Sequence, residues 1–263
     1  MKRESFGSRL GFILVSAGCA IGIGNVWKFP YICGAYGGAA FILIYLCFLV
    51  ILGIPVLVAE FAVGRGSHTS VAKCFDKLAP AGSCWKPLKF IGIIGCYMLK
   101  MFYTTVGGWM IYFCVKSLRG DFVGASPEAV TQSISAMLGN AQTMMLWMVI
   151  ICLIGFAVCF MGLQNGIEKI SKVMMSALLI IMVILAVHSV MMEGAGEGIR
   201  FYLVPDFQKI KEAGVGNVVF AALSQSFFTL SIGIGAMLIF GSYLDKSRSL
   251  TGEAVSITVL DTF

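Results

Sequence analysis

The chain has 263 residues, of which 59% are hydrophobic and only 12% are charged, and its mean hydropathy is +0.92. A soluble domain carries about 25% charged residues, so this composition excludes an ordinary water-soluble protein and indicates a membrane protein. The net charge of +6 does not indicate nucleic-acid binding, because the basic residues gather on alternate loops. The scattered cysteines do not indicate a disulfide framework.

Several apolar stretches are long enough to cross a bilayer, which takes about 20 residues of helix. In chain order, the predicted spans 1 to 6 cover residues 8–29, 39–63, 89–117, 143–162, 167–192 and 215–244. A further apolar run, 254–263, is expected to start span 7. Two surface helices are also expected, one in SHTSVAKCFDKLAP (67–80) and one at 128–138. The sequence therefore predicts an all-α, truncated, single transmembrane domain over residues 1–263.

The basic residues predict how the chain is oriented, because cytoplasmic loops carry an excess of Lys and Arg. Most of the 19 basic residues fall on the N-terminal segment and on the loops after spans 2, 4 and 6. They are Lys2, Arg3, Arg9, Arg65, Lys73, Lys77, Lys86, Lys89, Lys169, Lys172, Lys246 and Arg248. We expect a multi-pass protein of the cell membrane with a cytoplasmic N-terminus. Its surroundings are membrane lipid, and no nucleic-acid partner is expected.

Glycine clusters lie near the middle of spans 1 and 6, in GCAIGIGN (18–25) and TLSIGIG (229–235). Glycine costs about 1 kcal/mol relative to alanine inside a helix. One explanation is close helix packing, since small residues line helix interfaces in membranes. Matching clusters in two spans favour the other explanation, that both helices are broken mid-membrane where a ligand or ion satisfies the freed backbone groups.

Longer motifs around these clusters resemble a known family. SAGCAIGIGNVWKFPY (16–31), GGAAF (37–41), GIPVLVAEFAVGR (53–65) and SQSFFTLSIGIGAM (224–237) are similar to the neurotransmitter:sodium symporter family, most of all to its bacterial amino-acid transporters. The resemblance implies a LeuT-like fold of about twelve spans with inverted five-span repeats. This chain would supply the first inverted repeat (spans 1–5), span 6 and the start of span 7, with spans 1 and 6 broken.

The resemblance also implies a substrate site at the two breaks. Freed amides near Ile23 and Gly24 would hold an amino-acid carboxylate, which suits the positive end of a helix dipole. Gly22 stands where monoamine transporters of the family carry an aspartate, so an amino acid is favoured over an amine. The implied substrate-binding residues are Ala20, Ile23, Gly24, Leu99, Tyr103, Phe228, Thr229, Ser231 and Ile234.

Two sodium ions would bind at the same breaks, according to the resemblance. The carbonyl of Ala20, the side-chain oxygen of Asn25 and Thr229 would bind the first ion. The carbonyls of Gly18 and Ile21 would bind the second, whose other family ligands belong to span 8 and lie outside this chain.

Asp261 has two alternative roles by resemblance. It would either replace the family's asparagine ligand for sodium on span 7, or supply the carboxylate that chloride-independent members often keep on that span. Tyr45 and Gln225 match residues of the chloride site in chloride-dependent relatives. The sequence therefore leaves chloride dependence open.

The gates and the hinge are implied in the same way. Lys28 matches a basic outer-gate residue, and Arg3 and Phe6 match an N-terminal latch whose inner partner is Tyr243. Arg3 is explained equally well as a charge that sets topology. Glu60 would accept hydrogen bonds from the freed backbone of span 6.

Together these features predict a secondary active transporter of a bacterial inner membrane. It would couple an amino acid to co-transported sodium by symport with alternating access, and the isolated chain is expected to be incomplete. The alternative is a membrane scaffold or regulatory subunit without transport activity. An enzyme is not expected, since neither a metal-ligand cluster nor a Ser/His/Asp arrangement is discernible. The sequence leaves the amino acid, the sodium stoichiometry and the oligomeric state open.

Overall fold

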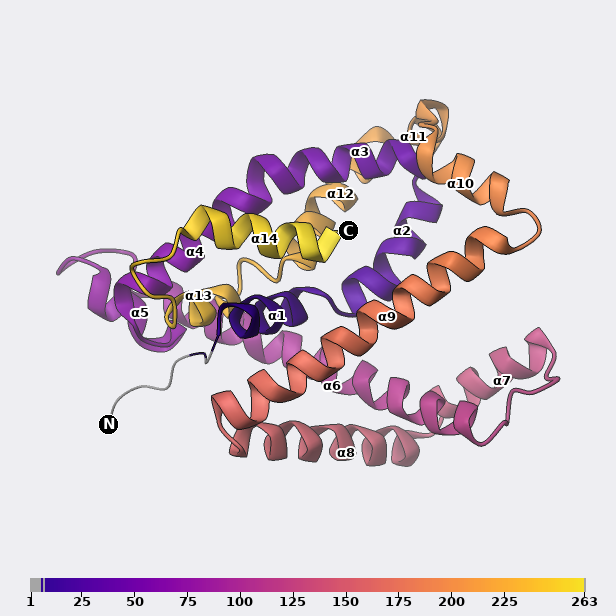
Figure 1. The fold of residues 1–263 in the computed structure, drawn as a ribbon, viewed down its shortest axis with the longest axis horizontal. Coiled ribbons are helices and arrows are strands. Elements are labelled where there is room, and N and C mark those ends of the chain that lie inside the picture. Colours follow the sequence, from indigo (N-terminus) through magenta and orange to yellow (C-terminus); the bar gives the residue numbers. More distant parts are fainter. Residues whose placement is uncertain (1–5, 7, 263) are drawn as a thin grey trace. The chain divides into compact units, whose positions relative to one another are not determined.

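The computed structural model describes residue 6 and residues 8–262, and all regular structure in this part of the chain is helical (Figure 1). The chain divides into two compact units. The first comprises Met1–Ile93 and Leu163–Phe263, and the second is Ile94–Gly162. The all-helical fold class predicted from the sequence is confirmed.

The first unit begins with a broken helix pair. Helix α1 (Arg9–Ala20) starts at Ser8, whose Oγ accepts a hydrogen bond from the Gly11 N–H and caps the helix. A π-helical stretch, η1 (Gly24–Lys28), then leads into α2 (Phe29–Ala35). The two halves meet at a bend of 49°.

The next element of the first unit is continuous over Ala39–Ser67 and consists of α3 (Ala39–Phe48), η2 (Leu49–Gly53) and α4 (Ile54–Ser67). Helix α4 ends where His68 adopts a left-handed conformation, and its N–H bonds to the Gly64 carbonyl. The short helix α5 (Val71–Leu78) follows and packs against α4.

The C-terminal part of the first unit contains a second helix break. Helix α12 (Val215–Thr229) and helix α13 (Ala236–Gly241) flank an irregular segment, 230–235. The remaining elements are η3 (Leu163–Glu168), α9 (Lys169–Met191), α10 (Ala195–Leu203), α11 (Phe207–Ala213) and α14 (Leu250–Thr262).

The second unit consists of the greater part of α6 (Leu88–Leu118), together with α7 (Pro127–Leu138) and α8 (Ala141–Phe160). Both shorter helices have side-chain N-caps. Ser126 Oγ accepts from the Ala129 N–H, and Asn140 Oδ1 accepts from the Thr143 N–H. Such caps are favourable because the first N–H groups of a helix have no partner within it.

Among the described residues, four helices are long and apolar enough to cross a membrane, and five if the bent pair counts as one span. They are Ala39–Ser67, Leu88–Leu118, Ala141–Phe160, Leu163–Met191 and the pair Arg9–Ala20 with Gly24–Ala35. Helix α12 has 15 residues and is too short by itself. The chain is therefore a multi-pass membrane protein.

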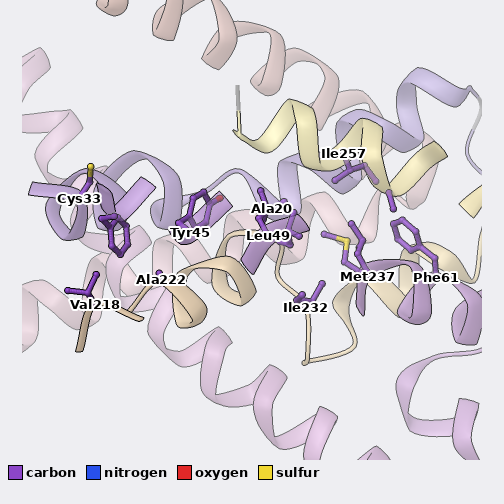
Figure 2. Packing of buried hydrophobic residues seen from close by; sticks show 14 of the residues in the cluster. Ala20, Cys33, Tyr45, Leu49, Phe61, Val218, Ala222, Ile232, Met237 and Ile257 are labelled. Carbon is purple, nitrogen blue, oxygen red and sulfur yellow. The ribbon is translucent and has the colours of Figure 1, made fainter. Parts of the chain in front are cut away.

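The core of the first unit forms where α4, α13 and α14 meet the first helices. Its largest fully buried side chains include Phe41, Phe61, Leu57, Met237 and Ile257, several of which are visible in Figure 2. Helices α4 and α13 pack most closely at two glycines. A Cβ on Gly241 would lie 2.6 Å from the Phe61 Cα, and one on Gly64 would overlap the Leu238 carbonyl. Small residues let helix backbones approach in this way.

Two buried carboxylates contact the first turn of α1. Glu253 Oε1 of α14 accepts from Arg9 Nε at 2.9 Å. Glu168 Oε1 accepts from Lys172 Nζ at 2.7 Å, and its carboxyl group packs directly over Gly11. Carboxylates stabilise a helix N-terminus through the helix dipole, so these two contacts hold the start of α1.

Helix α14 begins at Leu250, four residues before the start predicted for span 7, 254. The sequence criterion excluded charged residues, but Glu253 is buried through its ion pair with Arg9. In addition, Ser249 Oγ accepts from the Gly252 N–H and caps the helix. Residues 163–166, which lie between the predicted spans 4 and 5, are also helical: they belong to η3, which continues into α9.

The glycine contact between α4 and α13 generates a stability prediction. Gly64→Ala should destabilise the protein by about 1–3 kcal/mol, because overpacking forces backbone shifts. The change is measured as a shift of the thermal unfolding midpoint in detergent, with the fraction of protein that stays monodisperse as the readout. Gly66→Ala is the matched control, since its Cβ would lie at an ordinary 3.7 Å from Leu78. Equal midpoints for the two variants would refute the close-packing account.

Candidate functional site

The break between α1 and η1 frees backbone groups in the middle of the first span. Ile21 turns to φ −70 and ψ 105, and its N–H makes the last bond of α1, to the Ala17 carbonyl. Beyond the break, the N–H groups of Asn25 and Val26 both donate to the Gly22 carbonyl, at 3.1 and 3.2 Å. Between these bonds the Gly22 N–H donates to Asn25 Oδ1 at 3.5 Å, so the regular helical bonding is interrupted over residues 21–24.

The break between α12 and α13 depends on residues with positive φ. Gly233 and Gly235 have φ values of 90 and 77, which glycine adopts without steric cost. Ser231 has φ 52, which costs a non-glycine residue about 1–2 kcal/mol. Its hydroxyl donates to the Cys19 carbonyl at 2.9 Å. Ser231 therefore joins the second break to the end of α1.

Glu60 of α4 satisfies part of the second break. Its carboxylate accepts from the Gly233 N–H at 2.6 Å and from the Leu238 N–H at 3.2 Å. Both donors would lack a helical acceptor near the start of α13. This geometry is what a hinge-supporting role for Glu60 requires.

Three polar side chains from distant segments meet beside the two breaks. Asn25 Nδ2 donates to Asp261 Oδ1 at 2.9 Å and to the Asp261 carbonyl at 3.0 Å. Thr229 Oγ1 donates to Asp261 Oδ2 at 2.8 Å. Thr229 and Asp261 are 1% and 8% exposed, so the two carboxylate oxygens of Asp261 and the hydroxyl oxygen of Thr229 lie together and are nearly buried. Such hard, partly anionic oxygens suit an alkali-metal cation.

A cavity of about 510 Å³ opens on this cluster. Asn25, Tyr45, Thr229 and Asp261 form its polar end, and Ile21 lies next to them. The rest of the lining is mainly apolar and comes from α1, α3, α9, α10 and α14: Leu14, Leu46, Met175, Leu179, Leu203 and Leu260. The polar end could hold an ion in contact with a ligand that enters from the cavity.

Gln225 and Phe228 pack against Gly24 at the first break. Gln225 is fully buried, and its Nε2 donates to the Gly24 carbonyl at 3.1 Å. A Cβ on Gly24 would lie 2.8 Å from the Phe228 ring. The Lys28 Nζ lies 4.2 Å from the centre of that ring, in a cation–π contact. A side chain at position 24 would have to displace the Phe228 ring, so this close approach favours glycine there.

The residues predicted for the inner latch are described in part. Phe6 packs edge-on against Tyr243 at 5.7 Å and against Phe12 at 5.5 Å between ring centres. Arg3 lies outside the described residues. The contact joins the segment before α1 to the end of α13.

The other predicted residues divide between the two units. Gly18, Ala20 and Ile23 lie at the first break, and Ile234 lies at the second. Leu99 and Tyr103 lie on α6 in the second unit, and their part in the site stays a prediction.

Comparison with known proteins decides the family. The model of the Sodium:neurotransmitter symporter family matches residues 3–128 and 126–263. The chain belongs to this family. The predicted resemblance is therefore confirmed, and the family is one of transporters rather than enzymes.

Individual members of the symporter family match almost the whole chain. It is 36% identical over 261 residues to the uncharacterized sodium-dependent transporter YhdH of Bacillus subtilis, covering 99% of this chain and 56% of the relative. An uncharacterized sodium-dependent transporter of Methanocaldococcus jannaschii is 32% identical, with coverages of 99% and 53%. The chain thus spans about half the length of these relatives.

A solved symporter also matches. The crystal structure of MhsT in complex with L-phenylalanine superposes with a TM-score of 0.89 at 37% identity, covering 99% of this chain and 58% of that one. This likeness confirms the LeuT-like fold.

Several contacts of the candidate site could not be predicted from the sequence. The hydrogen bonds from Ser231 to Cys19 and from Gln225 to Gly24 have no sequence signal, because they join segments about 200 residues apart. The role of Asp261 was left open because only the first turns of the predicted span 7 belong to the chain. Without a fixed start for that helix, the face on which Asp261 lies could not be predicted. The signal that could have helped was Ser249, whose position as an N-cap fixes the start of α14.

Glu60 generates the prediction for this site. Glu60→Gln removes one of the two acceptor oxygens, and leaving the N–H of the buried Leu238 unpaired costs about 1–3 kcal/mol. We expect a lower unfolding midpoint and faster amide exchange in 230–238, measured by hydrogen–deuterium exchange. Glu197→Gln, at an exposed position on α10, is the control. Unchanged exchange in 230–238 would contradict the hinge role.

Proposed function

We propose that the protein is a sodium-coupled symporter of an amino acid. The observation that carries this proposal is the meeting of Asn25, Thr229 and Asp261 at the two helix breaks. Membership of the symporter family supports it, as do relatives described as sodium-dependent transporters. Because the chain spans about half the length of those relatives, the activity is proposed for the whole transporter to which these residues belong.

The first sodium ion would bind between the two breaks. Asn25 Oδ1, Thr229 Oγ1 and Asp261 would ligate it, with the carbonyl of Ala20 from the end of α1. In the described structure Asn25 and Thr229 both donate hydrogen bonds to the Asp261 carboxylate. A bound cation would take the place of these donor hydrogens beside the carboxylate and would balance its negative charge. A second ion would bind the carbonyls of Gly18 and Ile21, with further ligands from outside this chain.

The substrate would be an amino acid with an apolar side chain. Its carboxylate would meet the freed amides of Ile23 and Gly24 and complete the shell of the first ion. Phe228, Ser231 and Ile234 would line the side-chain pocket. A crystal structure of MhsT with L-phenylalanine supports an apolar amino acid. Ion and substrate would then stabilise each other directly, which is a thermodynamic coupling between two ligands.

Asp261 is proposed to be both a sodium ligand and the fixed negative charge of the site. Its contacts with Asn25 and Thr229 support the first role that the sequence left open. A buried carboxylate beside the ion also balances its charge, which is the second role. Tyr45 and Gln225, the residues of the chloride-site region, would then serve in packing and in bonding Gly24, without a bound chloride.

Transport would proceed by alternating access in a cell membrane, with the N-terminus in the cytoplasm. Each inward sodium ion contributes about 2.3 kcal/mol per 100 mV, plus its concentration term. The contact of Phe6 with Tyr243 would close the inner side, and Lys28 above Phe228 would contribute to the outer gate. The Lys28–Phe228 contact lies next to the helix breaks, where the chain can bend.

Uptake into proteoliposomes tests the proposed coupling. An inward sodium gradient should drive accumulation of an apolar amino acid, and potassium should not. Asn25→Ala should lower uptake at least tenfold, since losing one charge-assisted ligand costs about 1.5–3 kcal/mol. The matched control is Asn217→Ala, at the exposed start of α12. Equal uptake in sodium and potassium would refute the coupling, whereas no uptake of any amino acid in either salt would favour a scaffold or regulatory role.

Chloride replacement tests the role of Asp261. If its carboxylate supplies the fixed charge, uptake should be the same in chloride and in gluconate. Asp261→Asn should abolish sodium-driven uptake in gluconate, whereas Asp76→Asn, on the exposed side of α5, should have no effect. A native protein that needs chloride would contradict this assignment.

A further inference from the structure

The loop between α4 and α6 combines exposed lysines with exposed aromatic and aliphatic side chains. Over residues 71–90 it carries four lysines and one aspartate: Lys73, Lys77, Lys86, Lys89 and Asp76. The side chains of Leu78, Trp85, Leu88 and Phe90 are 45%, 64%, 37% and 59% exposed. We propose that this loop, called the basic loop below, binds anionic phospholipid headgroups at the membrane surface, with Trp85 inserted at the interface.

The position of the basic loop follows from its neighbours. It joins two helices that are each long and apolar enough to cross a membrane, Ala39–Ser67 and Leu88–Leu118. Trp85 comes three residues before the second of these helices begins. A tryptophan at such a boundary lies at the level of the lipid headgroups, which accept both its apolar ring and its N–H.

The basic loop is held in place by its own contacts. Val71 and Cys74 are buried against Leu238 of α13 and anchor one face of α5. Lys77 Nζ donates to the Ser67 carbonyl at 2.7 Å, at the end of α4. Lys89 Nζ binds both oxygens of Asp76, at 2.8 and 2.7 Å. The loop is therefore already ordered, so binding to a membrane surface would cost it little conformational entropy.

The tip of the basic loop is also ordered. The Ser83 N–H donates to the Pro80 carbonyl, and the Leu88 N–H donates to the Trp85 carbonyl, both at 3.1 Å. Ser83 Oγ accepts from the Trp85 N–H at 3.1 Å. These turns fix the backbone on both sides of Trp85, so the exposed ring is held in a defined position.

The charges of the basic loop favour an anionic partner. Lys89 neutralises Asp76, which leaves the positive charges of Lys73, Lys77 and Lys86 without an acidic residue in the loop. By contrast, residues 193–212 mix three glutamates and an aspartate with Arg200, Lys209 and Lys211. A lysine near a surface of anionic lipid contributes about a fivefold preference over neutral lipid. Lys73 and Lys86 are both exposed and should account for most of the selectivity.

Tryptophan quenching by brominated lipids tests the proposal without sodium or amino acid, so its outcome is independent of transport. The purified protein is reconstituted in vesicles of phosphatidylcholine and phosphatidylglycerol, with bromine on one lipid at a time. The chain has four tryptophans, and the difference between native protein and Trp85→Phe isolates the Trp85 signal. We expect brominated phosphatidylglycerol to quench this signal at least twofold more than brominated phosphatidylcholine at equal mole fraction.

Charge variants and soluble quenchers complete the test. The double variant Lys73→Gln/Lys86→Gln should lose the preference, and Arg119→Gln/Lys211→Gln, exposed on other segments, should keep it. Equal quenching by the two lipids would overturn the proposal. Quenching of Trp85 by aqueous iodide but not by brominated lipid would also overturn it, as would the absence of quenching by either. Loss of the preference in inorganic phosphate at matched ionic strength would instead indicate a site for soluble anions, which also overturns it.

Discussion

A helix that stops inside a membrane leaves N–H and C=O groups without partners, and each such group costs several kcal/mol in an apolar medium. Residues 8–262 contain two such helix breaks, and side chains from other segments provide hydrogen-bond partners for some of the freed groups at each. Glu60 receives the N–H groups of Gly233 and Leu238, and the Ser231 hydroxyl bonds to the Cys19 carbonyl. The close packing of α4 on α13, which needs glycine at 64 and 241, keeps Glu60 in reach of the break.

The same interruptions position the polar cluster. Asn25 follows the first break, Thr229 precedes the second, and Asp261 reaches both from α14. Two broken helices and one continuous helix thus bring an amide, a hydroxyl and a carboxylate to a single point beside a largely apolar cavity. Because the backbone near the cluster is not fully used in helical bonds, its carbonyl groups can bind a cation and its N–H groups can bind a carboxylate. Fold and proposed function therefore rest on the same unpaired groups.

Local sequence patterns were sufficient for the helical fold and for the location of both breaks, because apolar length and paired glycine clusters are local signals. The family motifs carried Asn25, Thr229 and Glu60 as candidates. What remained out of reach was pairing between distant segments. The start of α14 is set by Ser249, which caps the helix, and by Glu253, which is buried because it pairs with Arg9. A criterion based on apolar residues alone places Glu253 outside the span. The contact of Gly24 with Phe228 likewise depends on tertiary packing.

The central claim is that a sodium ion completes the polar demand of both breaks at once. Hydrogen–deuterium exchange of the reconstituted protein in sodium and in potassium, at equal ionic strength, tests it most directly. Sodium at about 100 times its dissociation constant stabilises the bound form by about 2.7 kcal/mol, close to a hundredfold in opening equilibrium. We predict slower exchange in sodium at both 21–26 and 229–235, with α8 unchanged as an internal reference. Equal exchange in the two salts, or protection at one break alone, would contradict the account.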